Sequence, residues 1–302
     1  MAVTLTQLAA FLAVARCGSV TAAAEELVVT QPSVSAAVSA LERELGVALM
    51  ERSGRHLVPT AAGRAYLPYA SDVIGLLEQG RRTAHEAAQP EGSSLRVSAV
   101  TTAGEHLAPL LIQSFRKIHP ELRVSLDVGN RAIIFGRLTD HSVDVAITGR
   151  IPPGARLQAE PFADNEIVLV AAPSDPLVKR RWVAPEELGH RSWLLREDGS
   201  GSRAMCEEYL ASHGLEPDVL TLGSNGAIRH AARVGLGVAL VPRISVDLEL
   251  SHGLLAPLHV RGGLPKRSWY LARSAVGPVP EPVQQFIAFV RSDAGRRALA
   301  GG

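Results

Sequence analysis

The feature that most constrains the fold is a change of sequence pattern near residue 90. Up to about residue 88 the apolar residues recur at helical spacing, whereas afterwards short β-branched runs alternate with helical segments. The two patterns meet at Gln89-Pro90-Glu91-Gly92-Ser93-Ser94, whose Pro, Gly and Ser content is typical of a linker. We therefore expect a helical N-terminal part that is joined to a C-terminal α/β part.

The composition excludes several classes of protein. The 302 residues include 31 Lys and Arg against 30 Asp and Glu, and 46% are hydrophobic. Such values are typical of a globular protein of two or three domains, and not of a disordered or fibrous chain. The first residues do not resemble a signal peptide, and no apolar run approaches the roughly 18–20 residues of a membrane span. Because Cys17 and Cys206 are the only cysteines, we expect no disulfide scaffold and a cytoplasmic location.

Three short helices are predicted in the first sixty residues. The first ends at Gly18, the second ends at Leu27, and the third runs from about Thr30 to Leu45 and Gly46. One face of the third helix is small and polar, and it contains Pro32, Ser35, Ala36, Ser39 and Arg43. Such a face suits the recognition helix of a helix-turn-helix, which must lie deep in the major groove of DNA. An ordinary helical hairpin is the alternative, and it is favoured by the weak basic charge of this part.

A β-wing is predicted directly after these helices, in the segment LMERSGRHLVPT. Arg52 and Arg55 stand on either side of a Ser-Gly turn, where they would reach the DNA backbone or the minor groove. The alternative is an ordinary solvated turn.

A long helix is predicted from Thr60 onward. Its apolar positions are spaced alternately by three and four residues, as in a coiled coil. The expected dimerisation residues are Leu67, Ala70, Ile74 and Leu77. Pairing of two such helices would place two DNA-binding units side by side, whereas the alternative is that the helix packs on its own domain.

The N-terminal segment from Gly18 to Gly63 resembles the winged helix-turn-helix of the LysR-type transcriptional regulators. The resemblance is carried by Ser19, Ala23, Ala24, Leu27, Gln31, Pro32, Ser33, Val34, Ser35, Leu41, Glu42, Leu45, Gly46, Leu49, Arg52, Thr60, Ala62 and Gly63. It implies a cytoplasmic bacterial regulator that binds pseudo-palindromic double-stranded promoter DNA. It also implies homodimers formed through the linker helix, usually assembled as homotetramers, with RNA polymerase as a further candidate partner.

The resemblance also assigns residues to the DNA interface. Carried over by position, Gln31, Pro32, Ser33 and Ser35 begin the recognition helix, and Arg52 and Arg55 belong to the wing. Ser39, on the same small polar face, is also predicted to bind DNA. The chain departs from the family at Ala36, Ala37 and Ser39, where Arg, Lys or Gln is often found. We therefore expect fewer direct base contacts, and a larger share of specificity from DNA shape.

The C-terminal part alternates strands and helices, which predicts parallel α/β sheets arranged in two lobes. The predicted fold is an α winged helix-turn-helix plus a linker helix, followed by an α/β bilobed periplasmic-binding-protein-like effector domain. The expected boundaries are 1–60 for the DNA-binding domain, 61–89 for the linker helix and 90–302 for the effector domain. Lobe I is expected at about 95–164 and 269–302, and lobe II at about 165–268.

Hydroxyl and amide side chains follow several predicted strands of this part, at helix starts that favour anions. The predicted effector-binding residues are Thr101, Thr102, Asn130, Thr148, Ser200, Ser202 and Asn225. Each of them could instead be a simple helix cap. The C-terminal part most resembles the Calvin-cycle and sulfur-metabolism branch of the family, which implies a small anionic metabolite such as a carboxylate or sugar phosphate.

Two other classes of function are weighed against this prediction. The sequence contains no GxSxG, HExxH, P-loop or paired-Cys metal spacing, so we expect no enzymatic activity, no cofactor and no metal. The bilobed half would suit a solute-binding protein. The helical N-terminal part and the missing export signal argue against that class. Cys17 and Cys206 could act as redox sensors, as cysteines do in some regulators.

Overall fold

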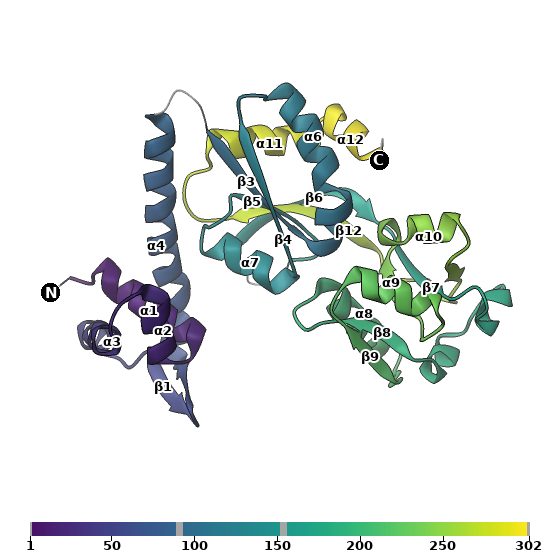
Figure 1. Cartoon of the computed structure of the whole chain (residues 1–302), viewed down its shortest axis with the longest axis horizontal. Coiled ribbons are helices and arrows are strands. Elements are labelled where there is room, and N and C mark those ends of the chain that lie inside the picture. The colour runs from purple at the N-terminus through teal and green to yellow at the C-terminus, as the bar shows by residue number, and fades with distance from the viewer. Residues whose placement is uncertain (1, 89–92, 152–155, 301–302) are drawn as a thin grey trace. The chain divides into compact units, whose positions relative to one another are not determined.

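The computed structural model describes residues 2–88, 93–151 and 156–300, and the chain divides into two compact units (Figure 1). The first unit comprises residues 1–89 and 139–142, and the second comprises residues 90–138 and 143–302. Within the described residues, no helix combines the length and the apolar character that crossing a membrane requires.

The first unit is built from four helices and one hairpin. These are α1 (Leu5–Cys17), α2 (Val20–Leu27), α3 (Gln31–Leu45), β1 (Met50–Ser53), β2 (His56–Pro59) and α4 (Ala61–Ala87). The helices begin where short polar side chains accept a hydrogen bond from a free backbone N–H group, as Thr4, Thr30 and Thr60 do. The three short helices bury one shared core, in which Phe11 and Leu41 are fully enclosed.

The hairpin is attached to α3 and α4 by specific contacts. The Glu42 carboxylate accepts hydrogen bonds from the backbone N–H groups of Leu49, at 2.8 Å, and Met50, at 3.1 Å. The Thr60 hydroxyl donates to the carbonyl of Ala48 at 2.7 Å. The first turn of α4 then passes so close that a Cβ atom on Gly63 would lie 2.0 Å from the Leu49 oxygen. The predicted winged helix-turn-helix is therefore confirmed.

Part of the predicted apolar row of helix α4 is buried against its own unit. Ala70 is 1% exposed, and Leu67 and Ile74 pack against the same core. A second row of large apolar side chains remains exposed along the helix, and it consists of Tyr69, Val73 and Leu77. Helix α4 therefore packs on its own domain along one face, as the alternative to dimerisation predicts. Its second apolar face is exposed.

The second unit contains two lobes. Lobe I has a five-stranded sheet in the order β4-β3-β5-β12-β6, with helices packed on it. Its elements are β3 (Ser94–Val100), α5 (Thr101–His106), α6 (Ala108–Ile118), β4 (Arg123–Gly129), α7 (Arg131–Thr139), β5 (Val145–Thr148), β6 (Leu157–Asn165), β12 (Arg267–Ser274), α11 (Glu281–Arg291) and α12 (Asp293–Ala300). Strand β3 runs parallel to β4 and β5, whereas β12 runs antiparallel to β5 and β6.

Lobe II has two smaller sheets, in the orders β10-β7-β11 and β8-β9. Its strands and α-helices are β7 (Ile167–Ala171), β8 (Trp193–Arg196), α8 (Gly201–Ser212), β9 (Val219–Leu222), α9 (Asn225–Arg233), β10 (Ala239–Pro242), α10 (Asp247–Ser251) and β11 (Ala256–Leu258). Short 3-10 helices lie at Pro176–Lys179, Pro185–His190 and Arg243–Ser245.

The prediction of parallel sheets is wrong for four of the seven strand pairs among the described residues of this unit. Strand β7 pairs antiparallel with both β10 and β11, and β12 closes the sheet of lobe I in the antiparallel sense. For β12 the reason is that the chain passes from lobe I into lobe II after β6 and returns through β12. A strand that returns from another lobe is not bound by the strand–helix–strand connection that makes neighbouring strands parallel.

Candidate functional site

The exposed face of α3 carries all of the residues that were predicted to bind DNA from this helix. Gln31, Pro32, Ser33, Ser35 and Ser39 are exposed, whereas Val34, Val38 and Leu41 on the opposite face are buried in the core. The Thr30 hydroxyl caps the helix and lies 2.8 Å from the Ser33 hydroxyl. A helix with a small polar face and a buried apolar face can approach a groove closely.

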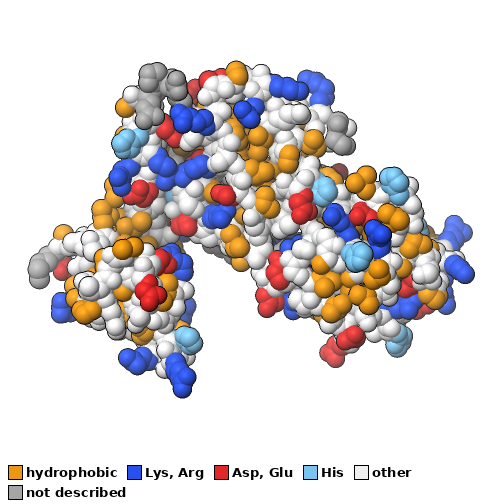
Figure 2. Space-filling view, viewed as in Figure 1, with side chains coloured by type: hydrophobic (Ala, Val, Ile, Leu, Met, Phe, Trp, Pro, Cys, Tyr) orange, Lys and Arg blue, Asp and Glu red, His pale blue; other side chains and the backbone are white. Residues whose placement is uncertain are grey.

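The hairpin presents two exposed arginines beside that helix. Strands β1 and β2 pair antiparallel, with Ser53 opposite His56, and Gly54 at the turn has a φ of +61°. Arg52 and Arg55 are exposed on this hairpin. Figure 2 shows Lys and Arg side chains at the tip of the first unit, where Figure 1 places β1.

A pocket between the two lobes collects the ends of several elements. Its cavity volume is about 70 Å³, and the unfilled space around it, which is continuous with solvent, is about 640 Å³. Its walls come from the carboxyl ends of β3 and β5 and from the starts of α5, α7 and α8. Because Gly201 and Ser202 begin α8, the free N–H groups of that helix start lie in the pocket wall.

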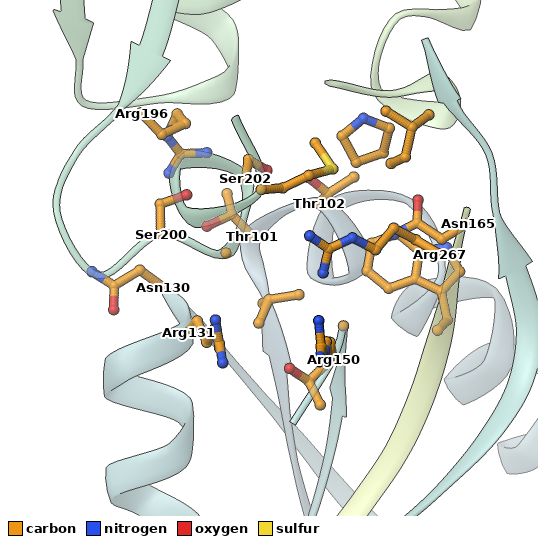
Figure 3. A pocket seen from close by; sticks show the side chains of 18 residues that line it. Thr101, Thr102, Asn130, Arg131, Arg150, Asn165, Arg196, Ser200, Ser202 and Arg267 are labelled. Carbon is orange, nitrogen blue, oxygen red and sulfur yellow. The ribbon is translucent and has the colours of Figure 1, made fainter. Parts of the chain in front are cut away.

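Four arginines surround the pocket. They are Arg131 at the start of α7, Arg150 after β5, Arg196 at the end of β8 and Arg267 at the start of β12. Figure 3 shows their guanidinium groups around the pocket, with Thr101, Ser200 and Ser202 among them.

The carboxylates near the pocket balance only part of this positive charge. Glu208 pairs with both Arg150, at 3.4 Å, and Arg267, at 3.1 Å. Glu197 pairs with Arg196 at 2.7 Å. Arg131 forms no ion pair with any residue in the part of the chain that the structure describes. Its guanidinium carbon lies instead 5.4 Å from the centre of the Phe135 ring.

The surroundings of Arg131 in the pocket are electrostatically unfavourable for its positive charge. Burial lowers the pKa of Arg131, and repulsion from Arg267 and Arg150 lowers it further. A lowered arginine pKa means that the surroundings disfavour the cation. An anion bound in the pocket would supply the missing negative charge.

Two polar side chains of the pocket wall have atoms without a hydrogen-bond partner among the described residues. The Thr148 hydroxyl and the amide oxygen of Asn165 are buried, and neither is satisfied by any described residue. A buried polar atom without a partner costs free energy, so such atoms are rare in folded proteins unless a ligand or water satisfies them. Both residues line the pocket.

Six of the seven predicted effector residues lie in the wall of this pocket, and these are Thr101, Thr102, Asn130, Thr148, Ser200 and Ser202. Asn225 does not line it. Asn225 lies behind the wall, where its side chain bonds to Arg196, Thr102 and Glu105.

The prediction missed Arg131, Asn165, Arg196 and Arg267. Arg131 and Arg196 carried a usable signal, since both stand at the carboxyl end of a predicted strand or directly beyond it. Among the residues that the structure describes, no group of three or more potential metal ligands comes together.

Sequence comparison connects both units with one family. Residues 5–64 match the model "Bacterial regulatory helix-turn-helix protein, lysR family", and residues 88–295 match "LysR substrate binding domain". The HTH-type transcriptional activator CmpR of Synechocystis sp. is 35% identical over 89% of this chain and 88% of its own. A RuBisCO operon transcriptional regulator of Allochromatium vinosum is 34% identical over 98% of both chains.

A solved structure agrees with these relatives. The regulatory domain of CcmR from Synechocystis, in complex with 2-PG, superimposes with a TM-score of 0.63 at 29% identity. The match covers 66% of this chain and 96% of the CcmR domain. The relatives also agree with the branch of the family predicted from the sequence. With both family models matched in order along its length, the chain belongs to the LysR-type transcriptional regulators.

Proposed function

We propose that the chain binds promoter DNA and that a small phosphorylated carboxylate in the pocket modulates this binding. The observation that carries the ligand class is the charge of the pocket. Four arginines meet two carboxylates, Glu197 and Glu208, and Arg131 has no ion-pair partner among the described residues. An excess of two cationic groups favours a ligand with more than one negative charge.

The ligand in the structure of the related CcmR domain indicates which compound to test first. The CcmR domain was solved with 2-phosphoglycolate, which carries a phosphate and a carboxylate on a two-carbon chain. We propose that Thr101, Thr102, Asn130, Thr148, Ser200 and Ser202 supply hydrogen bonds to such a ligand while the arginines balance its charge. The free N–H groups at the start of α8 suit a phosphate oxygen.

We further propose that α3 and the hairpin form the DNA interface. Gln31, Pro32, Ser33, Ser35 and Ser39 would face the major groove, and Arg52 and Arg55 would contact the flanking backbone or minor groove. The first 89 residues carry seven basic and eight acidic residues. Affinity would therefore depend on a few well-placed arginines and on several DNA-binding units acting together.

The proposed assembly is a homodimer formed through α4, with a homotetramer as the larger form. The exposed row of Tyr69, Val73 and Leu77 is the surface that a partner helix would cover. Of the four predicted dimerisation residues, Leu77 belongs to this row, whereas Leu67, Ala70 and Ile74 pack within the unit.

We propose that each of the three segments of the chain has one role. Residues 1–60 would bind DNA, residues 61–89 would pair, and residues 90–302 would bind the effector. Lobe I would span about 95–164 and 269–302, and lobe II about 165–268. We propose a cytoplasmic regulator that contacts RNA polymerase and acts by binding rather than by catalysis.

The proposed mechanism is a shift between arrangements of the two lobes. A ligand changes an equilibrium only when it binds the two states with different affinity. A ligand held by residues of both lobes, such as Thr101 and Ser200, binds best when the lobes are closed. Closure would then change the packing between subunits, and with it the spacing of the DNA-binding units.

The test is a mobility shift with the purified full chain and the DNA upstream of its own gene. It is carried out across a salt series, with and without 2-phosphoglycolate, and with glycolate and inorganic phosphate as controls. We expect a specific shift that 2-phosphoglycolate alters and the two controls do not. Loss of binding in Ser35→Glu with retained 2-phosphoglycolate binding would support separate DNA and effector sites. A specific shift that no anion alters would overturn the proposed ligand class.

A further inference from the structure

We infer that Asn225 is a positioning residue that holds the two lobes closed behind the pocket, and that it does not touch the ligand. Asn225 is the first residue of α9 in lobe II, is 8% exposed, and lies outside the pocket wall. Its effect on ligand affinity rests on the proposed function of the pocket, whereas its effect on lobe closure does not.

The Asn225 side chain bonds to residues of both lobes. Within lobe II its amide oxygen accepts a hydrogen bond from the Arg196 guanidinium. Its amide nitrogen donates to the Thr102 hydroxyl, at 3.2 Å, and to the Glu105 carboxylate, at 3.0 Å, both on α5 of lobe I. We call this set of four residues the interlobe bridge.

The chemistry of its partners determines the orientation of the Asn225 amide. A guanidinium has only donors, so the amide atom that faces Arg196 must be the oxygen. A carboxylate has only acceptors when ionised, so the atom that faces Glu105 must be the nitrogen. An asparagine satisfies both partners at once. An aspartate or a leucine at this position would satisfy at most one of them.

The interlobe bridge also reaches the ligand site through two of its members. Arg196 is 7% exposed and Thr102 is 5% exposed, and both line the pocket from opposite lobes. Asn225 therefore orients one cationic and one hydroxyl group of the wall. When the lobes separate, the bonds to Thr102 and Glu105 break, and the two groups move apart.

A second contact between the lobes lies near another part of the pocket wall. The backbone N–H group of Ala132 in lobe I donates to the Gly199 carbonyl in lobe II at 3.3 Å. The interlobe bridge differs from this backbone contact because it uses side chains, which substitution can change. It also differs from the ion pairs of Glu208 with Arg150 and Arg267, which join the lobes as well, because Asn225 is buried whereas Glu208 is exposed. If a closed arrangement is needed for ligand binding, the apparent affinity falls with the closed fraction.

The test uses Asn225→Asp, which keeps the size and the Arg196 contact but places an acceptor opposite Glu105. Hydrogen exchange of the α5 backbone amides in the ligand-free full chain measures closure, and calorimetry with 2-phosphoglycolate measures affinity. We expect faster exchange in α5 and about tenfold or more weaker binding, because like charges meet and a hydrogen bond is lost. The melting temperature shows whether α9 itself has been destabilised.

A second substitution separates bridging from other effects. In Asn225→Asp with Glu105→Gln, the glutamine amide can donate to the aspartate, so both exchange and affinity should return toward those of the original chain. The matched control is Asn225→Asp with Glu121→Gln, which removes an exposed charge elsewhere in lobe I and should not restore either value. The inference would be overturned if the two double variants had the same α5 exchange rates and the same affinity. It would also be overturned if Asn225→Asp left the exchange rates of the α5 amides unchanged. If the unaltered chain does not bind 2-phosphoglycolate but the exchange pattern holds, only the proposed ligand fails.

Discussion

Arg131 and Arg267 line one pocket, where burial and then the repulsion from Arg267 lower the pKa of Arg131. Glu208 offsets part of this repulsion, and an anion between the two guanidinium groups would offset the rest. The same positive charge that would bind the effector therefore opposes folding in its absence.

Replacing Arg131 with Met should separate these two effects. The ligand-free variant should melt at a higher temperature, and its affinity for 2-phosphoglycolate should fall by roughly ten- to a hundredfold, as expected for loss of a charged hydrogen bond. Thermal unfolding and calorimetry measure the two quantities. Arg116→Met on the exposed face of α6 is the control, and it should change neither. A variant that binds as tightly as the original chain would remove Arg131 from the site.

Thr148→Val tests the buried hydroxyl of the pocket wall. Thr148 is fully buried and its hydroxyl has no partner among the described residues, so valine should stabilise the ligand-free protein by about 1 kcal/mol. Affinity for 2-phosphoglycolate should fall, because the ligand loses a donor. Ser98→Ala is the contrasting control. The Ser98 hydroxyl donates to the Asp127 carbonyl at 3.2 Å, so its removal should destabilise the protein. Denaturant unfolding measures the free energy of unfolding of both variants. A change of the same sign in Thr148→Val and Ser98→Ala would contradict this account.

The exposed arginines of the hairpin give a prediction about salt dependence. If Arg52 and Arg55 each neutralise one phosphate, Arg52→Ala or Arg55→Ala should reduce the slope of log K against log salt by about 0.9. Binding should weaken similarly on specific and unrelated DNA, because phosphate contacts carry no sequence information. Fluorescence anisotropy across a salt series measures the slope. Arg116→Ala should leave the slope unchanged, and an unchanged slope in both hairpin variants would exclude the hairpin from the interface.

The helices of the first unit could be predicted from the sequence because their signals are local. The Thr30 side chain caps α3 by accepting a hydrogen bond from a backbone N–H group only three residues further along the chain. Gly46 ends the same helix directly after its last residue, Leu45. The directions of the C-terminal strands depend instead on distant partners. Ala239 pairs with Val170 and Tyr270 with Thr148, and no short pattern records such pairings.

The same distinction holds for the pocket. Thr101, Asn130 and Thr148 could be predicted because the parallel strands β3, β4 and β5 end at one edge of the sheet. Arg267 could not, since it begins a strand rather than ending one. It reaches the edge only because β12 runs antiparallel to β5, which brings the start of β12 to the end of β5.

Cys206 is predicted to be an unreactive thiol rather than a redox sensor. It is 2% exposed in α8, and burial raises its pKa to about 12. The thiolate is the reactive form, so Cys206 in Cys17→Ser protein should react with a disulfide reagent at pH 8 only as fast as the protein unfolds. Because the pKa is higher in the folded than in the unfolded state, this thiol should also make stability fall as pH rises from about 9 towards 12. Rapid labelling of the folded protein, or loss of DNA binding after peroxide treatment that Cys206→Ala prevents, would contradict this prediction.

Two glycines of α4 should respond in opposite directions to the same change. A Cβ atom on Gly63 would lie 2.0 Å from the Leu49 oxygen, so Gly63→Ala must push α4 away from the hairpin. We expect a loss of several kcal/mol, on the order of 3, in the stability of the first unit. Nothing lies within 4 Å of a Cβ on Gly80, so Gly80→Ala should stabilise the helix by about 0.5–1 kcal/mol. Hydrogen exchange of α1 and α3 amides in the full chain reports on the first unit directly. If Gly63→Ala left these amides as protected as in the original chain, the close passage of α4 over Leu49 would not contribute to holding the hairpin in place.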